Sequence, residues 1–289
     1  MATATVGINT SQMEGVFDAV GFAPADAIPN ALILSLSTVS KPIEGDASAL
    51  KVPYVATPPA AQIVAEGEEI DEGGAKPAVL KVYTRKVAVI ERITNETTAE
   101  TEVQNMLAAS MQRAITDKAD AVFLQNKPDA GDTAPTGLFE TTGAVDGGII
   151  TNALDPIVTA LGTVAANGAS PTAIVMNHAT WATLLLLKFA DGRPMIAPSV
   201  ADAPAPVLYG VPVVLNKMAP ANKIAIIDKA DIISAVGAVA MKGSEQRYFE
   251  QDSYAIRGTF RSGWGVIHPN RLAIITVNTT ATDDTNTTE

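Results

Sequence analysis

The sequence contains no cysteine among its 289 residues and only two histidines, His178 and His268. Without thiols, the chain has neither a disulfide framework nor a thiolate nucleophile. Zinc sites built from cysteine and histidine are excluded by count. The G-x-S-x-G motif of serine hydrolases is also missing. We therefore expect each histidine to cap a helix or pack against its neighbours, and we expect no catalytic residue and no metal site.

Nucleotide-binding and membrane-spanning patterns are missing as well. Neither G-x-x-x-x-G-K-[ST] nor G-x-G-x-x-G occurs, which excludes the common phosphate-binding loops and leaves no cofactor to expect. The longest apolar run, TWATLLLLKFA, is broken by Lys188 and falls well short of the ~20 residues that cross a bilayer. The N-terminus lacks the basic and apolar regions of a signal peptide. These absences predict a soluble protein made in a cytoplasm.

Positive charge is scarce and scattered. The formal net charge is −11, and basic residues gather only in isolated pairs such as Arg85-Lys86. This balance argues against a protein that grips nucleic acid through its phosphates. Hydrophobic residues make up 47% of the chain but aromatic residues only 5%. The chain therefore either buries a large core of small aliphatic side chains or covers apolar surface with other chains.

The sequence of the first third of the chain predicts an N-terminal arm followed by a β-hairpin. Residues 1–30 have weak periodicity and predict an extended arm, with one short helical piece at 11–20. A β-like run follows at 31–39. Strand-like sequence flanks the acidic, glycine-rich segment 65–74 and resumes at 79–92, which predicts two long strands joined by a flexible tip.

The rest of the chain predicts a long helix, a mixed unit and a return to strands. Residues 95–125 show apolar residues at helical spacing, and Thr97 and Glu100 have capping-box spacing. Residues 145–240 alternate helical and strand patterns and predict one α/β unit. Its expected strands are 172–177, 211–216, 223–228 and 231–236. Long alternating strands return after residue 245, and the polar tail is predicted to be disordered.

The acidic segment carries five carboxylates within ten residues: Glu66, Glu68, Glu69, Asp71 and Glu72. It does not match the EF-hand loop, and carboxylates on a glycine-rich tip are too well solvated to act as general acids. Three interpretations stay open: a solvated loop, a loose cation site, and a contact with the basic side chains of another chain. The candidate partners for such a contact are Arg85, Lys86, Arg257 and Arg261.

The order of these parts resembles the major capsid protein of tailed bacteriophages, which has the Hong Kong 97 fold. Three pieces carry the resemblance. IVAEG, residues 63–67, resembles the entry to the family's extended loop. MNHATWATLLLLKFADGRP with LYGVPVVL resembles its axial domain, and AIRGTFRSGWGVIHP resembles its last peripheral strands. The resemblance spans about residues 12–278 and implies an α+β fold.

The resemblance also implies a division of the chain into named regions. An N-terminal arm with a lead-in strand would occupy residues 1–45, and the extended β-hairpin loop residues 46–94. The peripheral domain, with its long spine helix, would combine residues 95–144 and 241–278. The axial domain would occupy residues 145–240 and the flexible tail residues 279–289.

The function that the resemblance implies is structural. The chain would assemble with copies of itself into pentamers and hexamers of an icosahedral shell that encloses double-stranded DNA. It would be a virion protein, assembled in the cytoplasm of a bacterial host, with no membrane partner and no sequence-specific DNA binding. We expect a separate scaffolding protein, because the chain begins almost at once with the N-terminal arm. A portal protein is also expected, with a decoration protein as an optional further partner.

Two alternatives remain open at this stage. The same fold forms the shells of encapsulin-like bacterial nanocompartments, which enclose enzymes. A soluble α/β enzyme with its site in residues 145–240 is the other alternative, although its catalytic motifs are missing. Some capsid relatives also join their subunits through a Lys–Asn isopeptide bond, for which Lys76 and Asn270 are the candidates here.

Overall fold

The computed structural model describes residues 20–22, 24–43, 47–64, 69, 72–94, 101–196 and 206–278. The chain forms two compact units. The first unit comprises Met1–Asp120, Pro128–Pro135 and Ile232–Ile267, and the second comprises Ala121–Lys127, Thr136–Asp231 and His268–Glu289. Each unit has its own sheet, and the two are described separately below.

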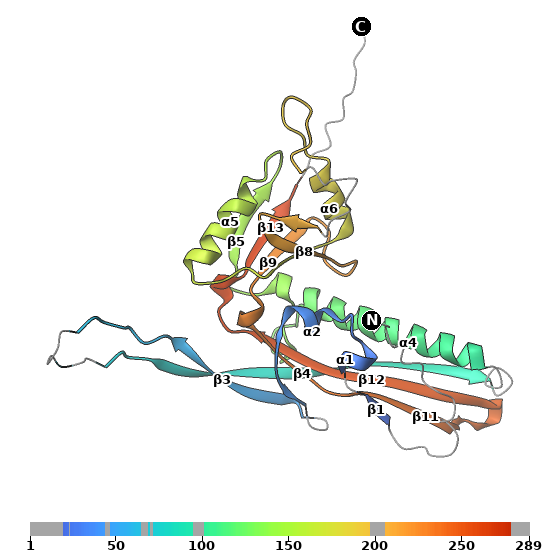
Figure 1. Ribbon diagram of the computed structural model, residues 1–289. Coiled ribbons are helices and arrows are strands. Elements are labelled where there is room, and N and C mark those ends of the chain that lie inside the picture. The colour runs from blue at the N-terminus through green and yellow to red at the C-terminus, as the bar shows by residue number, and fades with distance from the viewer. Residues whose placement is uncertain are drawn as a thin grey trace, which may run out of the picture. The chain divides into compact units, whose positions relative to one another are not determined.

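The first unit is organised by β4 (Lys76–Thr94), a strand of 19 residues rich in valine and isoleucine. Its first half pairs antiparallel with β3 (Ala49–Thr57), and its second half pairs antiparallel with β12 (Ser253–Val266). The β3–β4 ribbon, called the arm below, therefore extends from the sheet as a continuation of one of its strands (Figure 1). This ribbon confirms the hairpin expected from the sequence.

The sheet of the first unit has seven strands. On the edge of β12 away from β4, the first part of β12 pairs with β11 and its last part pairs with β10. β11 then pairs with β1, and β10 pairs with β2. Among the strands that the structure describes in this sheet, β10 and β2 pair in parallel and the other pairings are antiparallel. The bounds of these four strands are Val20–Phe22 for β1, Thr38–Pro42 for β2, Ile232–Val236 for β10 and Val239–Tyr248 for β11.

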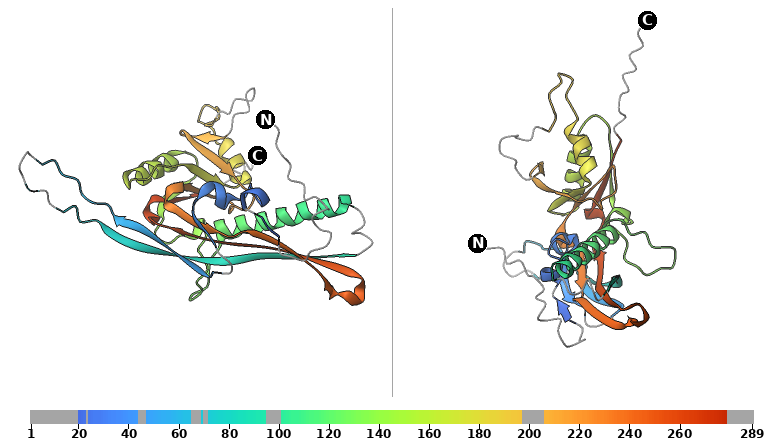
Figure 2. Two further views of the ribbon diagram at one scale, coloured as in Figure 1. Left: turned by 60° about the horizontal axis from the view of Figure 1, so that its bottom comes forward. Right: turned by 90° about the vertical axis from the view of Figure 1, so that its right-hand side faces the viewer.

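The long helix α4 (Thr101–Gln125) packs its first-unit part on one face of this sheet (Figure 2). Met111 and Ile115 are buried there. The close approach needs a glycine on the strand side, because a Cβ at Gly258 would lie 2.9 Å from Ile115 Cδ1. The expected helix is thus confirmed for residues 101–125, whereas Thr97 and Glu100 lie outside the described residues.

Residues 31–39 are not the single β-run expected from their sequence. They form the helix α2 (Leu32–Leu36) followed by the start of β2, after a short helix α1 (Pro24–Ala27). Ala31 at the N-cap has no side-chain acceptor, but the buried Asp120 carboxylate of α4 accepts a hydrogen bond from Leu32 N at 2.8 Å. A cap supplied from 88 residues away stabilises the helix. The local sequence of residues 31–39 therefore does not predict this helix.

The second unit contains a six-stranded sheet in the order β5-β13-β9-β6-β8-β7. Its strands are β5 Val145–Ile150, β6 Ala173–Met176, β7 Val207–Leu208, β8 Val211–Leu215, β9 Lys223–Ile227 and β13 Ala273–Val277. The runs AIVM and KIAII lie at its centre and are almost wholly buried. Because both faces of these strands are covered, their residues are apolar apart from Lys223, with no alternating polar side.

Two main helices belong to this unit, α5 (Asp155–Ala166) and α6 (His178–Leu185). Pro156 lies in the first turn of α5, and Gly168 follows its end with a φ of +86°, as the sequence pattern predicts. The Asn177 side chain caps α6 by accepting a hydrogen bond from Ala179 N at 3.0 Å. Short 3-10 turns complete the secondary structure: Leu138–Glu140, Lys229–Asp231, Phe249–Gln251 and Pro269–Arg271.

Two strands lie in a different sheet from the one expected. The segment 231–236, expected among the strands of residues 145–240, supplies β10 to the sheet of the first unit. Conversely, β13, expected with the closing strands of residues 241–278, lies between β5 and β9 in the second unit. Both are short apolar runs, and hydrophobic pattern alone does not identify the strand with which such a run pairs.

The cap of α2 generates a first prediction. Asp120→Ala removes the acceptor for Leu32 N and is expected to lower the free energy of unfolding by about 1–2 kcal/mol. Asp120→Asn keeps an acceptor oxygen and should retain most of that stability. Denaturant unfolding of the unassembled subunit measures both variants, and an equal loss in the two would argue against the cap.

The packing of α4 generates a second prediction. Gly258→Val places branched carbons against Ile115 and Met111 and is expected to cost about 1–3 kcal/mol of unfolding free energy. Gly162→Ala is the matched control, because no atom lies within 4 Å of a Cβ at Gly162 in α5. Removing a helical glycine should stabilise by about 0.5–1 kcal/mol. A Gly258→Val protein as stable as the parent would contradict the close packing.

Candidate intersubunit surfaces

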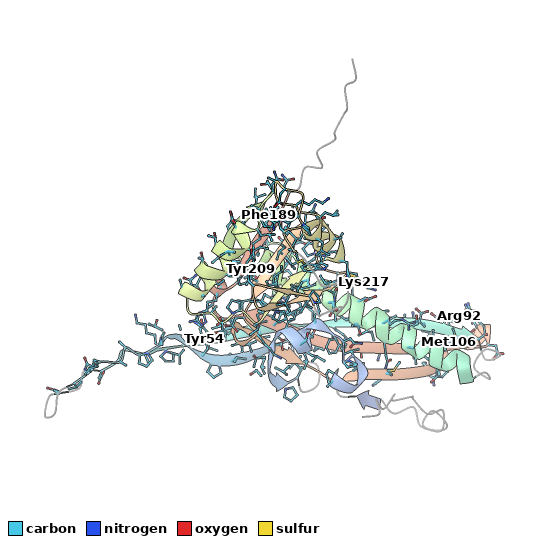
Figure 3. All side chains as sticks on the ribbon, turned by 45° about the horizontal axis from the view of Figure 1, so that its top comes forward. Tyr54, Arg92, Met106, Phe189, Tyr209 and Lys217 are labelled. Atoms are coloured by element: carbon cyan, nitrogen blue, oxygen red, sulfur yellow. The ribbon has the colours of Figure 1, made fainter. Side chains whose placement is uncertain are left out.

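The arm exposes apolar side chains to solvent. One side of the arm is half-buried. On this side three residues of β3 face three residues of β4, as the pairs Leu50–Val82, Val52–Leu80 and Tyr54–Ala78. Val82 also belongs to a small buried cluster with Ile43 and Ala235. On the other side Val55 and Val79 are 51% and 57% exposed. Figure 3 shows Tyr54 on the arm. An isolated two-stranded ribbon is marginally stable in water, so a ribbon with two such faces is typical of a contact surface.

The acidic segment lies where the two strands of the arm are joined. The hydrogen bond from Ala60 N to Gly73 O, at 2.9 Å, links the segment that follows β3 to the segment that precedes β4. Gly74 turns the chain with a φ of +63°. Glu69 and Glu72 are exposed to solvent. The other three predicted contact residues, Glu66, Glu68 and Asp71, lie outside the described residues.

Five basic side chains share the face of the first-unit sheet that is turned away from α4. Gly258 faces α4, so its neighbours in β12, Arg257 among them, point to the opposite side. Residues directly paired across strands share a face, which places the other cations of this face by register. This surface, called the basic face below, comprises Lys86 and Arg92 of β4, Lys242 of β11, and Arg257 and Arg261 of β12.

No carboxylate of the paired parts of β4, β11 and β12 lies on the basic face. Glu91, the one acidic residue in these parts, is paired with Ile256 and shares the side of α4. A protein of net charge −11 thus carries a uniformly positive strip on this sheet. Such a strip is complementary to an acidic partner.

The predicted partner residues divide between the two faces. Strand register places Lys86, Arg257 and Arg261 together on the basic face. Arg85 does not, because it pairs with Ser262 on the other side of the sheet and forms an ion pair with Asp132. Neighbouring residues in a strand point to opposite faces, so Arg85 and Lys86 do not form one surface.

The sequence analysis missed two members of the basic face, Arg92 and Lys242. Counting alternate positions forward from Lys86 would have indicated Arg92, whereas Lys242 depends on the pairing of β11 with β12. Arg92 is held in place, with Nε 3.2 Å from Ser253 Oγ and its guanidinium 5.5 Å from the centre of the Tyr248 ring. Arg261 is held in a similar way, because its Nη1 donates a hydrogen bond to Thr84 Oγ1 at 2.9 Å.

The second unit exposes a separate group of large apolar side chains. Tyr209 (φ +49°) and Gly210 (φ +80°) form a two-residue turn between β7 and β8, and Tyr209 is 56% exposed. Phe189 stands in a loop closed by its own hydrogen bond to Arg193 O, and Leu186 ends α6 in solvent. Figure 3 labels Phe189 and Tyr209 in this unit. Exposed apolar side chains of this size are candidates for contact with another chain.

The residues that the structure describes contain no cluster of potential metal ligands. No group of three or more acidic or histidine side chains is placed to hold a metal ion among those residues. His178 is exposed at the first position of α6, and His268 Nδ1 lies 2.7 Å from the buried Asp231 carboxylate, which Arg271 also contacts. None of the described helices has the length and apolar character needed to cross a membrane.

Solved structures share this fold. A structure from Gordonia phage Cozz is 16% identical, with a TM-score of 0.68 over 86% of this chain and 87% of the other. One from Mycobacterium phage Bobi is 17% identical, with a TM-score of 0.67 over 94% and 99%. The capsid of an empty GTA particle gives 19% identity and a TM-score of 0.62 over 86% and 90%.

Sequence comparison identifies the family. A comparison with curated proteins finds no match, but the model of the phage capsid family matches residues 28–277. The α+β capsid fold expected from the resemblance is confirmed, and the alternative of a soluble enzyme is wrong. The protein belongs to the phage capsid family and is a structural, non-enzymatic shell protein of the virion.

Proposed function

We propose that this protein is the major head subunit of a tailed phage and that its pentamers and hexamers form an icosahedral shell around double-stranded DNA. The observation that supports this most directly is the arm, which leaves its own sheet along β4 with apolar residues exposed on it. A surface of this kind acquires a partner when copies of the chain come together. The match to the phage capsid family favours this function over that of a nanocompartment shell.

The compact units suggest revised boundaries for the regions of the subunit. We assign the extended loop to residues 46–83, where β4 pairs with β3, the peripheral domain to the remainder of the first unit, and the axial domain to the second unit. The exposed turn at Tyr209 and the loop at Phe189 are then the surfaces through which axial domains meet.

The acidic segment and the basic face form a complementary pair for contacts between copies. The carboxylates of the acidic segment, of which Glu69 and Glu72 are described and exposed, would lie near Lys86, Arg92 and Arg257 of another copy. Contacts between exposed charges contribute little free energy each. They fix orientation and partner, while apolar contacts supply most of the stability. Arg85 is left out of this pair because of its ion pair with Asp132.

Other partners follow from the same proposal. The net charge of −11 disfavours adhesion of the wall to packaged DNA, which is consistent with enclosure without sequence-specific binding. A separate scaffolding protein, a portal and a decoration protein would be produced with the subunit in the host cytoplasm. No cofactor is required. Covalent joining through Lys76 and Asn270 is not part of the proposal.

Self-assembly is the first prediction of the proposed function. The chain expressed with its neighbouring genes is expected to sediment as large particles that appear as closed shells in negative-stain micrographs. Light scattering on the purified material measures the same property. A monodisperse 29.9 kDa monomer at high concentration, with and without those gene products, would contradict the proposal.

Charge pairing between the acidic segment and the basic face is the second prediction. Glu69→Gln combined with Glu72→Gln should lower particle yield several-fold and make the remaining particles less sensitive to salt, because screened pairs have been removed. Glu140→Gln serves as the control, since Glu140 pairs with Lys223 in its own second unit at 3.4 Å. Unchanged yield and unchanged salt dependence in the double variant would rule out this pairing.

A further inference from the structure

Two lysines lie directly opposite each other on the arm. Lys51 of β3 and Lys81 of β4 are cross-strand partners in the antiparallel ladder, and both are exposed. Side chains in this relation have Cβ atoms about 4.5–5.5 Å apart, and like charges there destabilise the pairing. The arm therefore carries a local electrostatic cost in the isolated subunit.

Nothing among the described residues offsets that cost. Neither lysine forms a hydrogen bond or an ion pair with any residue that the structure describes. Between this pair and the tip, the side chains on the same face of the arm are Pro53, Val55, Pro77 and Val79, all uncharged and all exposed. Two cross-strand lysines thus border an exposed apolar surface.

We propose that Lys51 and Lys81 together bind a carboxylate presented by a second copy of this chain when subunits assemble. An anion between two ammonium groups converts their mutual repulsion into two charge-assisted hydrogen bonds. The apolar residues beside the pair would be covered by the same contact, which removes water and strengthens the pairing. The occupant that we infer is a protein carboxylate, because its charge is complementary to the two lysines and the chain carries 31 acidic residues against 20 lysines and arginines. This inference rests on the proposed function.

The proposal separates the stability of the subunit from its assembly. Lys51→Glu replaces the like-charge pair by a carboxylate opposite the Lys81 ammonium, so the unassembled subunit should unfold at the same temperature as the parent or at a higher one. The same substitution repels the carboxylate of the second copy. We expect the concentration needed for assembly to rise about tenfold or more. If the lysines had a purely structural role, a variant with unchanged or higher unfolding temperature would not show impaired assembly.

Matched variants distinguish this pair from the overall charge of the arm. Lys81→Glu should behave like Lys51→Glu, and the neutral Lys51→Gln should have a smaller effect in the same direction. Lys76→Glu makes the same change of charge on the same arm, but Lys76 lies on the opposite face of the ribbon, across from the uncharged Thr57. It should assemble at the concentration of the parent.

The test is a titration of particle formation, by sedimentation and negative-stain microscopy, for the full chain expressed with its neighbouring genes. A raised assembly threshold for the Lys51 and Lys81 variants, with normal thermal unfolding and a normal Lys76→Glu control, supports the proposal. Equal thresholds for Lys51→Glu and the parent overturn it and leave the proposed function intact. A defect in Lys51→Glu that disappears after nuclease treatment also overturns it, because the anion would then be a nucleic-acid phosphate. If the parent forms no particles, both proposals fail.

Discussion

A single continuous strand determines what this subunit can do. β4 runs for 19 residues, and half of it belongs to a sheet while the other half forms the arm. Because the ladder with β12 fixes the direction of the strand, the arm leaves the sheet without a flexible joint on the β4 side. The arm carries exposed apolar residues away from the first-unit sheet, and we propose that another copy of the chain covers them.

The charged surfaces fit this constraint. The basic face lies on the side of the sheet that α4 leaves uncovered, and the strongly acidic segment lies where the strands of the arm join. Exposed charges of this kind select a partner and an orientation, and a shell gains its stability by repeating modest contacts many times.

The sequence predicted the elements whose signals are local. The helix at 101–125 follows from apolar spacing, the arm from two strand-like segments around a glycine-rich tip, and the ends of α5 from Pro156 and Gly168. The family resemblance also followed from the order of these parts, and the family match confirms it.

What the sequence did not predict depends on distant residues. α2 owes its cap to Asp120, and β10 and β13 are short apolar runs whose sheets are decided by pairing. The same reason explains the candidate contact residues. Adjacent Arg85 and Lys86 looked like one basic group, but the pleat separates them, whereas Arg92, Lys242 and Arg257 come together only through strand register.

A cryo-electron microscopy map of the assembled particle tests the central claim most directly. It should show β3 and β4 as an extended ribbon that lies on a second copy of the chain, with β4 unbroken from the ribbon into its own sheet. A map in which the ribbon folds back onto its own subunit, so that one chain alone covers Val55 and Val79, would contradict this account.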